Sequence, residues 1–308
     1  MHKGKVVAEK GEFKVIDCEV CRFKHLDPIP TEDETTEFYK KKYFDLIKKG
    51  GRAPEIRRLT SGGDEANFER KWLESTLYND IEHILIKNLP KGSKNLCDIG
   101  CGTGDFLKYM IGMGWSGIGI EPTEDVGLSC SKSELTIYNR SLEEFIVVYP
   151  EYNYAFDAIT LLNVLEHVPN PIKFLQITKK FLKPHSGIIC VRVPNDFNEL
   201  QIHAQKKLKK DLWWIGIPDH INYFNIKSLQ KLLTSLDFEI IYTATDFPME
   251  LFLLMGDKYV ENPEVGHICH KRRVNFELSI PDVFRRKIYY NLSKIGIGRD
   301  CMVFAKIK

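Results

Sequence analysis

Long hydrophobic runs are missing from this sequence of 308 residues. No apolar stretch approaches the roughly 20 residues that a membrane helix needs, so we expect no membrane partner. The residues that follow Met1 include no apolar segment of the kind found in secretory signals. The sequence therefore predicts a cytoplasmic protein, and it indicates no particular oligomeric state.

An excess of charge of one sign is also missing, because 44 basic residues face 42 acidic ones and leave a formal net charge of +2. This balance gives no general attraction to the phosphate backbone, so nucleic acid is not an expected partner. Two interpretations of the local basic runs are open: they form solvated helix faces, or they contact an anionic substrate. These runs are Lys40–Lys42, Lys206–Lys210, Lys271–Arg273 and Arg285–Lys287.

Closely spaced cysteines are rare among the eight in the chain, and only Cys18 and Cys21 have a metal-like spacing. The others are scattered, mostly inside apolar runs, which predicts reduced thiols and not a disulfide framework. A tetrahedral zinc site needs four ligands, and Cys18, Cys21 and His25 supply three at most. We therefore expect no bound metal.

What is present from residue 95 onward is an alternation of strand-like and helix-like segments. This pattern predicts an α/β fold, with a Rossmann-like, mostly parallel sheet and helices on both faces. We expect an N-terminal cap segment over residues 1–60 and one main domain over 61–308, with an insertion at 246–299 before the last strand. The predicted strands are Leu96–Ile99, Gly117–Ile120, Leu135–Tyr138, Phe156–Leu162, Gly187–Val193, Phe238–Thr243 and Cys301–Ala305; a long helix is predicted over Glu65–Leu89.

A glycine-rich turn from Asp98 to Gly104 joins the first of these strands to a helix. This is the position at which open α/β sheets bind nucleotides, and glycine allows sharp turns and close approach of a ligand. The spacing is GxGxG, whereas the dinucleotide fingerprint is GxGxxG. Asp98 and Asp105 flank the turn, and carboxylates suit the ammonium of a methionine group better than a pyrophosphate.

Glu121 stands at the end of the second predicted strand. A carboxylate at that position can accept two hydrogen bonds from a ribose diol. Taken alone, Glu121 would be interpreted as an ordinary acid at the end of a strand. Its position after the glycine turn favours the interpretation that it binds a cofactor with a ribose.

Three segments resemble the motifs of class I S-adenosylmethionine-dependent methyltransferases, over about residues 95–245. Leu96–Gly104 resembles motif I, Phe156–Pro171 resembles motif IV, and Phe181–Gly187 resembles the turn before the fifth strand. The resemblance implies a seven-stranded sheet whose last strand, near Cys301–Ala305, is antiparallel to the rest. It also implies S-adenosylmethionine as the cofactor.

The same resemblance implies which residues contact that cofactor. The carboxylate of Asp98 would contact the methionine end and Glu121 would hold the ribose. Ser141 or Leu142 would lie near the adenine, and Leu162 and Asn163 would line the cofactor from the fourth strand. The complete expected set is Asp98, Gly100, Cys101, Gly102, Gly104, Glu121, Pro122, Ser141, Leu142, Leu162, Asn163 and Tyr43.

The N-terminal segment resembles a subgroup of these enzymes that has a small zinc module and a cap helix with tyrosines. The resemblance rests on Cys18-x-x-Cys21, on His25–Pro30 and on the aromatic residues around Tyr39 and Tyr43. The subgroup usually has two Cys-x-x-Cys pairs, and the first is absent here. Tyr43 would either close over the cofactor or pack the cap onto the main domain.

Two histidines, His220 and His167, are candidates for the catalytic base, since histidine titrates near neutral pH. Either could instead fix a loop by packing or hydrogen bonding. Trp213 and Trp214 could wall a pocket, and the end of the fifth predicted strand contributes Arg192 and Asn195 as candidate substrate contacts.

The sequence favours O-methylation of a small molecule or a sugar or glycan precursor, by in-line transfer. The proline-rich motif of amino-methylating nucleic-acid enzymes is absent after residue 162, where Asn163–Glu166 stands instead. Two alternatives stay open: an RNA or protein methyltransferase that uses the basic insertion, and a cofactor-binding module without catalysis.

Overall fold

The computed structural model describes residues 2–41, 62–123 and 135–308. Tyr43 therefore lies outside the described residues, and its expected role is not addressed further. Among the helices of the described part, none combines the length and the apolar character that crossing a bilayer requires. The cysteines of this part are free thiols.

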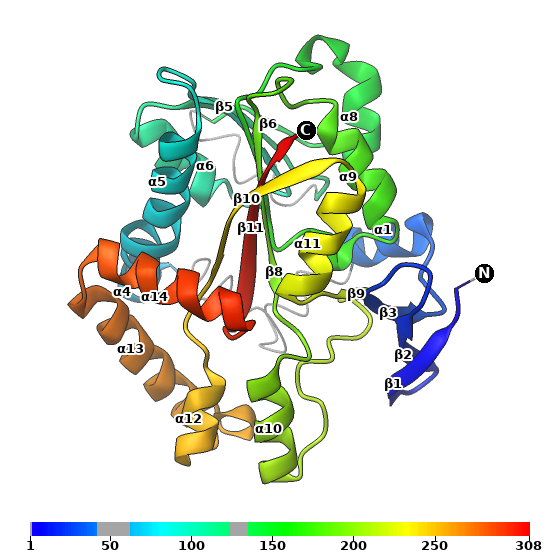
Figure 1. Cartoon of the computed structure of the whole chain (residues 1–308), viewed down its shortest axis with the longest axis vertical. Helices are drawn as coiled ribbons and strands as arrows, with labels where there is room; N and C mark the ends of the chain where they lie inside the picture. Colours follow the sequence, from blue (N-terminus) through cyan, green and yellow to red (C-terminus); the bar gives the residue numbers. More distant parts are fainter. Residues whose placement is uncertain (1, 42–61, 124–134) are drawn as a thin grey trace.

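A seven-stranded sheet runs through the molecule and confirms the predicted fold (Figure 1). Its strand order is β10-β11-β8-β7-β4-β5-β6. The central pairings are parallel, whereas β11 is antiparallel to both β8 and β10. The strands are β4 (Asn95–Ile99), β5 (Ser116–Ile120), β6 (Ile137–Tyr138), β7 (Ala158–Leu162), β8 (Ile188–Pro194), β10 (Phe238–Thr245) and β11 (Asp300–Ile307).

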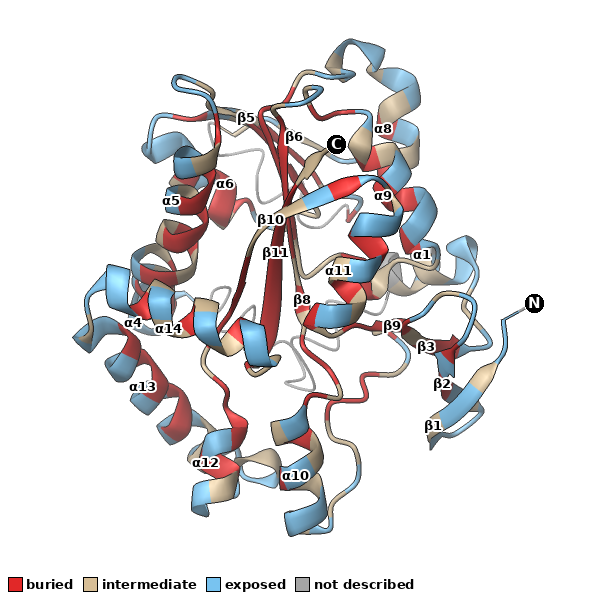
Figure 2. Ribbon diagram, in the orientation of Figure 1, coloured by how far each residue is buried: buried red, intermediate tan, exposed pale blue. Residues whose placement is uncertain are grey.

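Helices cover both faces of this sheet, and their inward sides are buried (Figures 1 and 2). One face packs against side chains such as Phe145, Leu175 and Leu229, and the other against Trp72, Leu85 and Phe106. Burial of these apolar faces is the main force that holds the layers together. The first face carries α8 (Leu142–Val148), α9 (Pro171–Lys179) and α11 (Ile226–Ser235); the second carries α4 (Gly63–Leu73), α5 (Asn79–Asn88), α6 (Asp105–Gly112) and α14 (Asp282–Ile295).

Some elements differ from the sequence expectation. The predicted long helix contains a π-helical segment, Glu74–Tyr78, between α4 and α5. Helix α10 (Glu199–Leu208) was not predicted, because its short apolar stripe is weak against many lysines. The expected insertion is helical and contains α12 (Glu250–Met255) and α13 (Pro263–Ser279) as well as α14.

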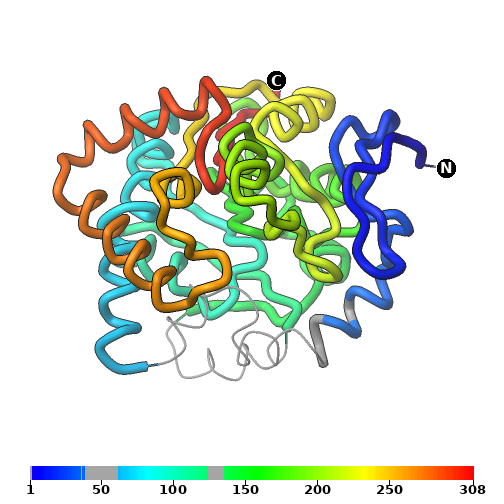
Figure 3. Tube along the Cα trace, turned by 90° about the horizontal axis from the view of Figure 1, so that it is seen from below, coloured from blue at the N-terminus to red at the C-terminus, as the bar shows by residue number. Residues whose placement is uncertain are grey.

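A second sheet of four strands is formed by the N-terminal segment together with one strand from the main domain. Its order is β1-β2-β3-β9. Figure 3 shows this segment in blue on the side of the molecule opposite to α12 and α13. Strand β9 belongs to residues 61–308, so the pairing of β3 with β9 crosses the predicted domain boundary at residue 60. The boundary itself stays a prediction. The strands are β1 (Gly4–Lys10), β2 (Phe13–Cys18), β3 (Lys24–Asp27) and β9 (Asn222–Tyr223). Helix α1 (Glu32–Lys41) follows the sheet and starts at a capping pair, in which Thr31 and Glu34 each accept a hydrogen bond from the other's amide.

The basic runs of the insertion are largely engaged in ion pairs. Arg285, which is 1% exposed, binds Asp80 through two hydrogen bonds. Arg273 binds Asp246, and Arg272 binds Asp257. Arg285 therefore ties α14 to the main domain at Asp80, Arg273 is buried in an ion pair within the insertion, and Arg272 pairs at the surface.

Candidate functional site

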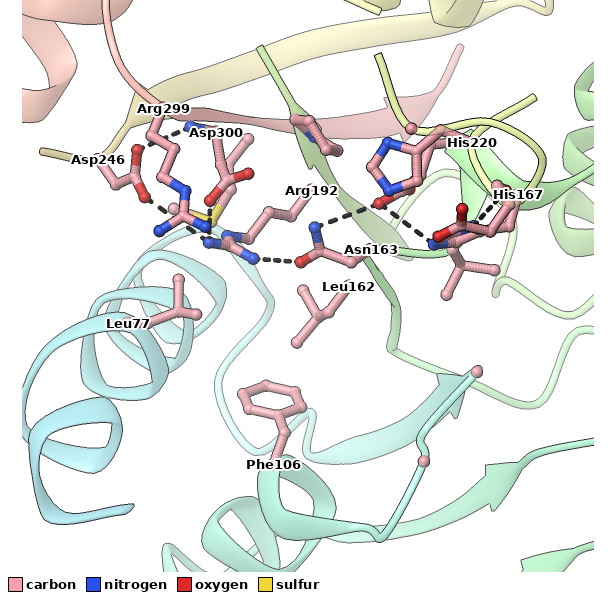
Figure 4. A pocket seen from close by; sticks show the side chains of 18 of the residues that line it. Leu77, Phe106, Leu162, Asn163, His167, Arg192, His220, Asp246, Arg299 and Asp300 are labelled. Atoms are coloured by element: carbon pink, nitrogen blue, oxygen red, sulfur yellow. Dashed lines mark hydrogen bonds and ion pairs between the residues drawn. The ribbon is translucent and has the colours of Figure 1, made fainter. Parts of the chain in front are cut away.

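A cavity of about 1610 Å³ opens at the carboxyl ends of the parallel strands. Pockets for a single small ligand span roughly 300–1,000 Å³, so this cavity has room for a cofactor and an acceptor together. The turns after β4, β5, β7 and β8 all contribute to its wall. Figure 4 shows part of that wall with its polar side chains.

The glycine turn after β4 supplies one side of the cavity. Gly100 has a φ of +71°, and a Cβ atom there would lie 2.4 Å from Val164 Cγ2. Gly102 has a φ of +51° and open space where its Cβ would be. The first glycine is therefore required by packing, whereas the second leaves the main chain accessible to a ligand.

Gly104 differs from the other two glycines because it does not line the cavity. Its φ is +77°, and a Cβ atom would lie 2.8 Å from Leu135 Cδ1. It forms the N-cap of α6. Its observed role is to start the helix, and its expected contact with the cofactor stays a prediction.

Asp98 lies at the end of β4, is 2% exposed and lines the cavity. The Thr160 hydroxyl donates a hydrogen bond of 2.6 Å to its Oδ1. Burial raises the pKa of the Asp98 carboxyl to about 7, although the hydrogen bond from Thr160 opposes this shift. A cationic ligand group would favour the ionised form, so the site fits the ammonium of a methionine moiety.

Glu121 follows β5 and holds the glycine turn in place. Its Oε2 accepts a hydrogen bond from the Gly102 amide, and its Oε1 accepts one from the Thr123 amide, both over 3.0 Å. Glu121, Pro122 and Cys101 all line the cavity. The sequence analysis assigned Asp98 and Glu121 to one site through the family resemblance. The fold places both side chains at one cavity.

The remaining expected cofactor residues also line the cavity, namely Ser141, Leu142, Leu162 and Asn163. Ser141 has a structural task as well, because its hydroxyl caps α8 by accepting a hydrogen bond of 3.1 Å from the Glu144 amide. The residues present therefore fit S-adenosylmethionine at the methionine, ribose and adenine ends, and direct contact at each residue stays a prediction.

The two candidate bases, His167 and His220, meet at the cavity (Figure 4). Their ring centroids are 4.9 Å apart in an edge-to-face arrangement. His167 Nδ1 donates a hydrogen bond of 2.7 Å to the Asp219 carbonyl, which can only accept. In the neutral ring, His167 Nε2 is then the lone-pair nitrogen, and it lies 3.8 Å from Glu166 Oε1.

A chain of polar contacts leads from this pair across the cavity (Figure 4). Asn163 donates a hydrogen bond of 3.2 Å to Glu166 Oε1 and accepts one from Arg192. Arg192 also donates to Asp300 on β11. The sequence suggested Arg192 as a substrate contact but missed Glu166 and Asp300, since no local pattern distinguishes these acids from surface carboxylates.

Asn195 does not have the expected role. It is completely buried, does not line the cavity, and donates hydrogen bonds of 3.0 Å to the carbonyls of Gly296 and Gly298. Its side chain joins the end of β8 to the loop before β11. The expected substrate contact is therefore wrong, and Asn195 has a structural role.

Another part of the wall collects buried polar groups that sequence reasoning missed. Asp196, Gln201 and Glu250 are each less than 5% exposed and line the cavity. Each has a side-chain oxygen without a hydrogen-bond partner in the part of the chain that the structure describes. Burial and the nearby acids Glu166, Asp300 and Glu250 raise the pKa of Asp196 well above its usual range. These oxygens are available to a ligand that carries hydrogen-bond donors.

Among the described residues, two clusters of side chains have donor atoms close enough to share a metal ion, within 4.8 Å of one another. One is Glu166, His167 and His220 in the cavity, and the other is His2, Cys18, Cys21 and His25 at the N-terminal sheet. The count of three ligands for the second cluster was wrong. The fold brings in His2, which is far from the cysteines in sequence.

The part of the chain that carries this site matches a known protein family. Residues 73–243, more than half of the chain, match the family model of a methyltransferase domain. The chain belongs to this methyltransferase family. It is an S-adenosylmethionine-dependent methyltransferase, and its glycine turn, Asp98 and Glu121 all lie inside the matched region.

Curated relatives are enzymes named ubiquinone biosynthesis O-methyltransferase. The one from Dinoroseobacter shibae is 30% identical over 154 residues, which cover 47% of this chain and 59% of that enzyme. The one from Vibrio cholerae is 28% identical over 203 residues, which cover 62% of this chain and 79% of that enzyme. Several matches span less than half of the relative, as for Thiobacillus denitrificans, where the share is 42%.

Solved structures show the same fold at low sequence identity. A SAM-dependent methyltransferase from Archaeoglobus fulgidus aligns with a TM-score of 0.50 and 19% identity over 79% of this chain and 100% of that one. The plantazolicin methyltransferase in complex with SAH aligns with a TM-score of 0.52 and 15% identity over 89% of this chain and 94% of that one. At these identities, the two structures show that the fold is shared and nothing more.

Proposed function

We propose that this methyltransferase transfers a methyl group to a hydroxyl of a small, polyhydroxylated acceptor such as a sugar or glycan precursor, with His220 as the base. The observation that carries the proposal is the His167–His220 pair, which lines the same cavity as the cofactor turn. The relatives named O-methyltransferases support oxygen as the acceptor atom. We place the activity in the cytoplasm, where thiols stay reduced.

S-adenosylmethionine, when bound, supplies a methyl group that is already activated on a sulfonium. The protein then has to align the acceptor oxygen and remove its proton. His220 would take that proton, a step that contributes roughly 10²–10⁴-fold in rate. Glu166, buried beside His167 Nε2, would stabilise the positive charge that the histidine pair acquires.

The unpaired oxygens of Asp196, Gln201 and Glu250 support a hydroxyl-rich acceptor. A sugar hydroxyl can both donate and accept, so it can pair with an ionised or a protonated carboxyl and with the amide. A flat apolar ring would leave these groups buried and unsatisfied, at a cost of about 1–3 kcal/mol each. Trp214 Nε1, also without a partner among the described residues, offers a donor at the same cavity. Acceptors with several hydroxyls should therefore bind better than apolar phenols.

An RNA acceptor has less support. The guanidinium groups of Arg272, Arg273 and Arg285 are paired with acids of the chain itself, which leaves little of the expected basic face in the insertion. Tight RNA binding that weakens steeply with salt would restore that alternative.

The test is methyl transfer from radiolabelled S-adenosylmethionine to two acceptor panels, nucleotide-linked sugars and phenols. We expect product from the sugar panel and a strong loss of turnover in His220→Ala. The matched control is His203→Ala, because His203 is exposed and its ring hydrogen-bonds to the Glu199 carbonyl in its own helix.

Two outcomes would contradict the proposal. Product from phenols alone would remove the acceptor class. Turnover that requires added Mg²⁺ would mean that Glu166, His167 and His220 hold a metal, and His220 would then be a ligand and not the base.

A further inference from the structure

Four side chains converge at the edge of the N-terminal sheet: His2 before β1, Cys18 at the end of β2, Cys21 in the following turn, and His25 in β3. Their donor atoms all lie within 4.8 Å of one another. We propose that these residues bind one zinc ion in a tetrahedral Cys₂His₂ site, which fastens the start of the chain to the sheet. Two sulfurs and two imidazole nitrogens are a donor set that favours zinc.

The distances fit such a site as the chain stands. His2 Nδ1 lies 3.3 Å from Cys21 Sγ and 3.6 Å from Cys18 Sγ. Zinc lies about 2.3 Å from sulfur and about 2.0 Å from nitrogen, so a tetrahedron separates S from N by about 3.5 Å. The observed spacings bracket that value.

His25 is arranged as metal-ligating histidines usually are. Its Nδ1 donates a hydrogen bond of 2.7 Å to the Leu26 carbonyl, which can only accept. In the neutral ring, Nε2 is then a lone-pair acceptor. The ring is completely buried, and Nε2 has no hydrogen-bond partner in the described part of the chain. Ligand histidines commonly donate their second ring nitrogen to a backbone carbonyl, and a metal would satisfy the first.

The turn between the two cysteines is shaped around the sulfur atoms. Arg22 has a φ of +63°, and its amide donates to the Cys18 carbonyl over 2.9 Å. The Cys21 amide points at Cys18 Sγ over 3.4 Å. The turn therefore folds back on the sulfur of Cys18 and brings both cysteines to one point.

The site is connected to the loop that carries His220. His25 pairs with Asn222 between β3 and β9, and the Leu26 amide donates to the Ile221 carbonyl over 2.9 Å. Phe23 packs on Phe224 with ring centroids 4.9 Å apart. The zinc would therefore brace the segment directly after His220 as well as the chain start.

The experiment uses the full chain, without a histidine tag, purified under reducing conditions and dialysed with a trace of zinc. Metal content is measured by plasma mass spectrometry, and the zinc environment by X-ray absorption. His2→Ala is the decisive variant, because His2 is exposed and its ring contacts His25, which is itself a proposed ligand. His203→Ala is the control, since that histidine is also exposed but lies on α10.

We expect His2→Ala to lose one zinc per chain relative to the wild type and to the control. Loss of a residue that only orients a ligand costs roughly 10–100-fold in metal affinity, and loss of a ligand should cost more. The absorption spectrum should show two sulfur and two nitrogen neighbours. A chelator should lower the melting temperature of the wild type and leave that of His2→Ala unchanged.

Three outcomes would overturn the proposal. One is a wild-type chain that holds no zinc while it binds S-adenosylmethionine normally. Another is a His2→Ala variant that keeps the full zinc content. The third is an intact mass showing that Cys18 and Cys21 form a disulfide under these reducing conditions. None of these readouts depends on the acceptor or on turnover, so the zinc site and the proposed reaction fail or stand separately.

Discussion

His167 and His220 lie edge to face with ring centroids 4.9 Å apart, although one follows β7 and the other follows β8 and α10. The contact is fixed from both sides. His167 donates to the Asp219 carbonyl, and the Ile221 amide donates to the Glu166 carbonyl over 2.8 Å. Both bonds flank His220, so the position of each histidine depends on the other's loop.

This relationship predicts different effects for the two histidines. His220→Ala should lower kcat about 10²–10⁴-fold, as expected for loss of a general base. His167→Gln should mainly raise the KM of the acceptor, because a glutamine can still donate to the Asp219 carbonyl. Steady-state kinetics of both variants separates the roles, and a larger fall in kcat for His167→Gln would assign the base to His167.

The pKa of about 7 for the Asp98 carboxyl predicts pH-dependent cofactor binding. Protonation removes the negative charge that an ammonium needs, so the Kd for S-adenosylmethionine should rise as the pH falls below 7. The limit is about tenfold per pH unit. Titration calorimetry between pH 5.5 and 7 in two buffers should show proton release on binding. Asp98→Asn should bind weakly with a flat profile, and an unchanged slope in that variant would assign the effect to another carboxyl.

Gly102 offers a test with a close structural match in Gly11. Both have a positive φ, +51° and +62°, and neither has an atom within 4 Å of a Cβ. Alanine at either position should reduce stability by about 1–2 kcal/mol, the cost of a left-handed backbone. Only Gly102→Ala should also weaken cofactor binding, because its Cβ would project into the space left open at the turn. Equal affinities for the two variants would show that the turn does not approach the ligand.

The buried pair of Arg285 and Asp80 predicts a large loss of stability when one partner is removed. Arg285→Met leaves Asp80 buried with Arg286 as its remaining cationic partner in the described part of the chain, and breaking such a pair costs about 3–5 kcal/mol. The control is the exposed pair of Lys210 and Glu261, for which Lys210→Met should change stability by less than about 1 kcal/mol. Urea unfolding of both variants gives the comparison.

Local sequence patterns carried most of the fold. Short apolar runs predicted the central strands because helices bury both faces of that sheet, and one-sided apolar stripes predicted the helices. The GxGxG turn marked the cofactor end of β4. Elements without a strong stripe, such as α10 and the two-residue β9, escaped prediction. The sequence wrongly predicted Asn195 as a substrate contact. Its side chain is buried by a loop about 100 residues away, at Gly296 and Gly298, which no local pattern reveals.

The sequence by itself determined the family and the cofactor, because these depend on residues that are close together along the chain. It also singled out Asp98 and Glu121, which the fold places at one cavity. Tertiary structure alone decided which distant groups meet. It joined His167 to His220, brought Arg192 between Asn163 and Asp300, and carried His2 to Cys18 and Cys21. Contacts of this kind arise from sheet pairing and from chain reversal, and no local pattern of residue types records them.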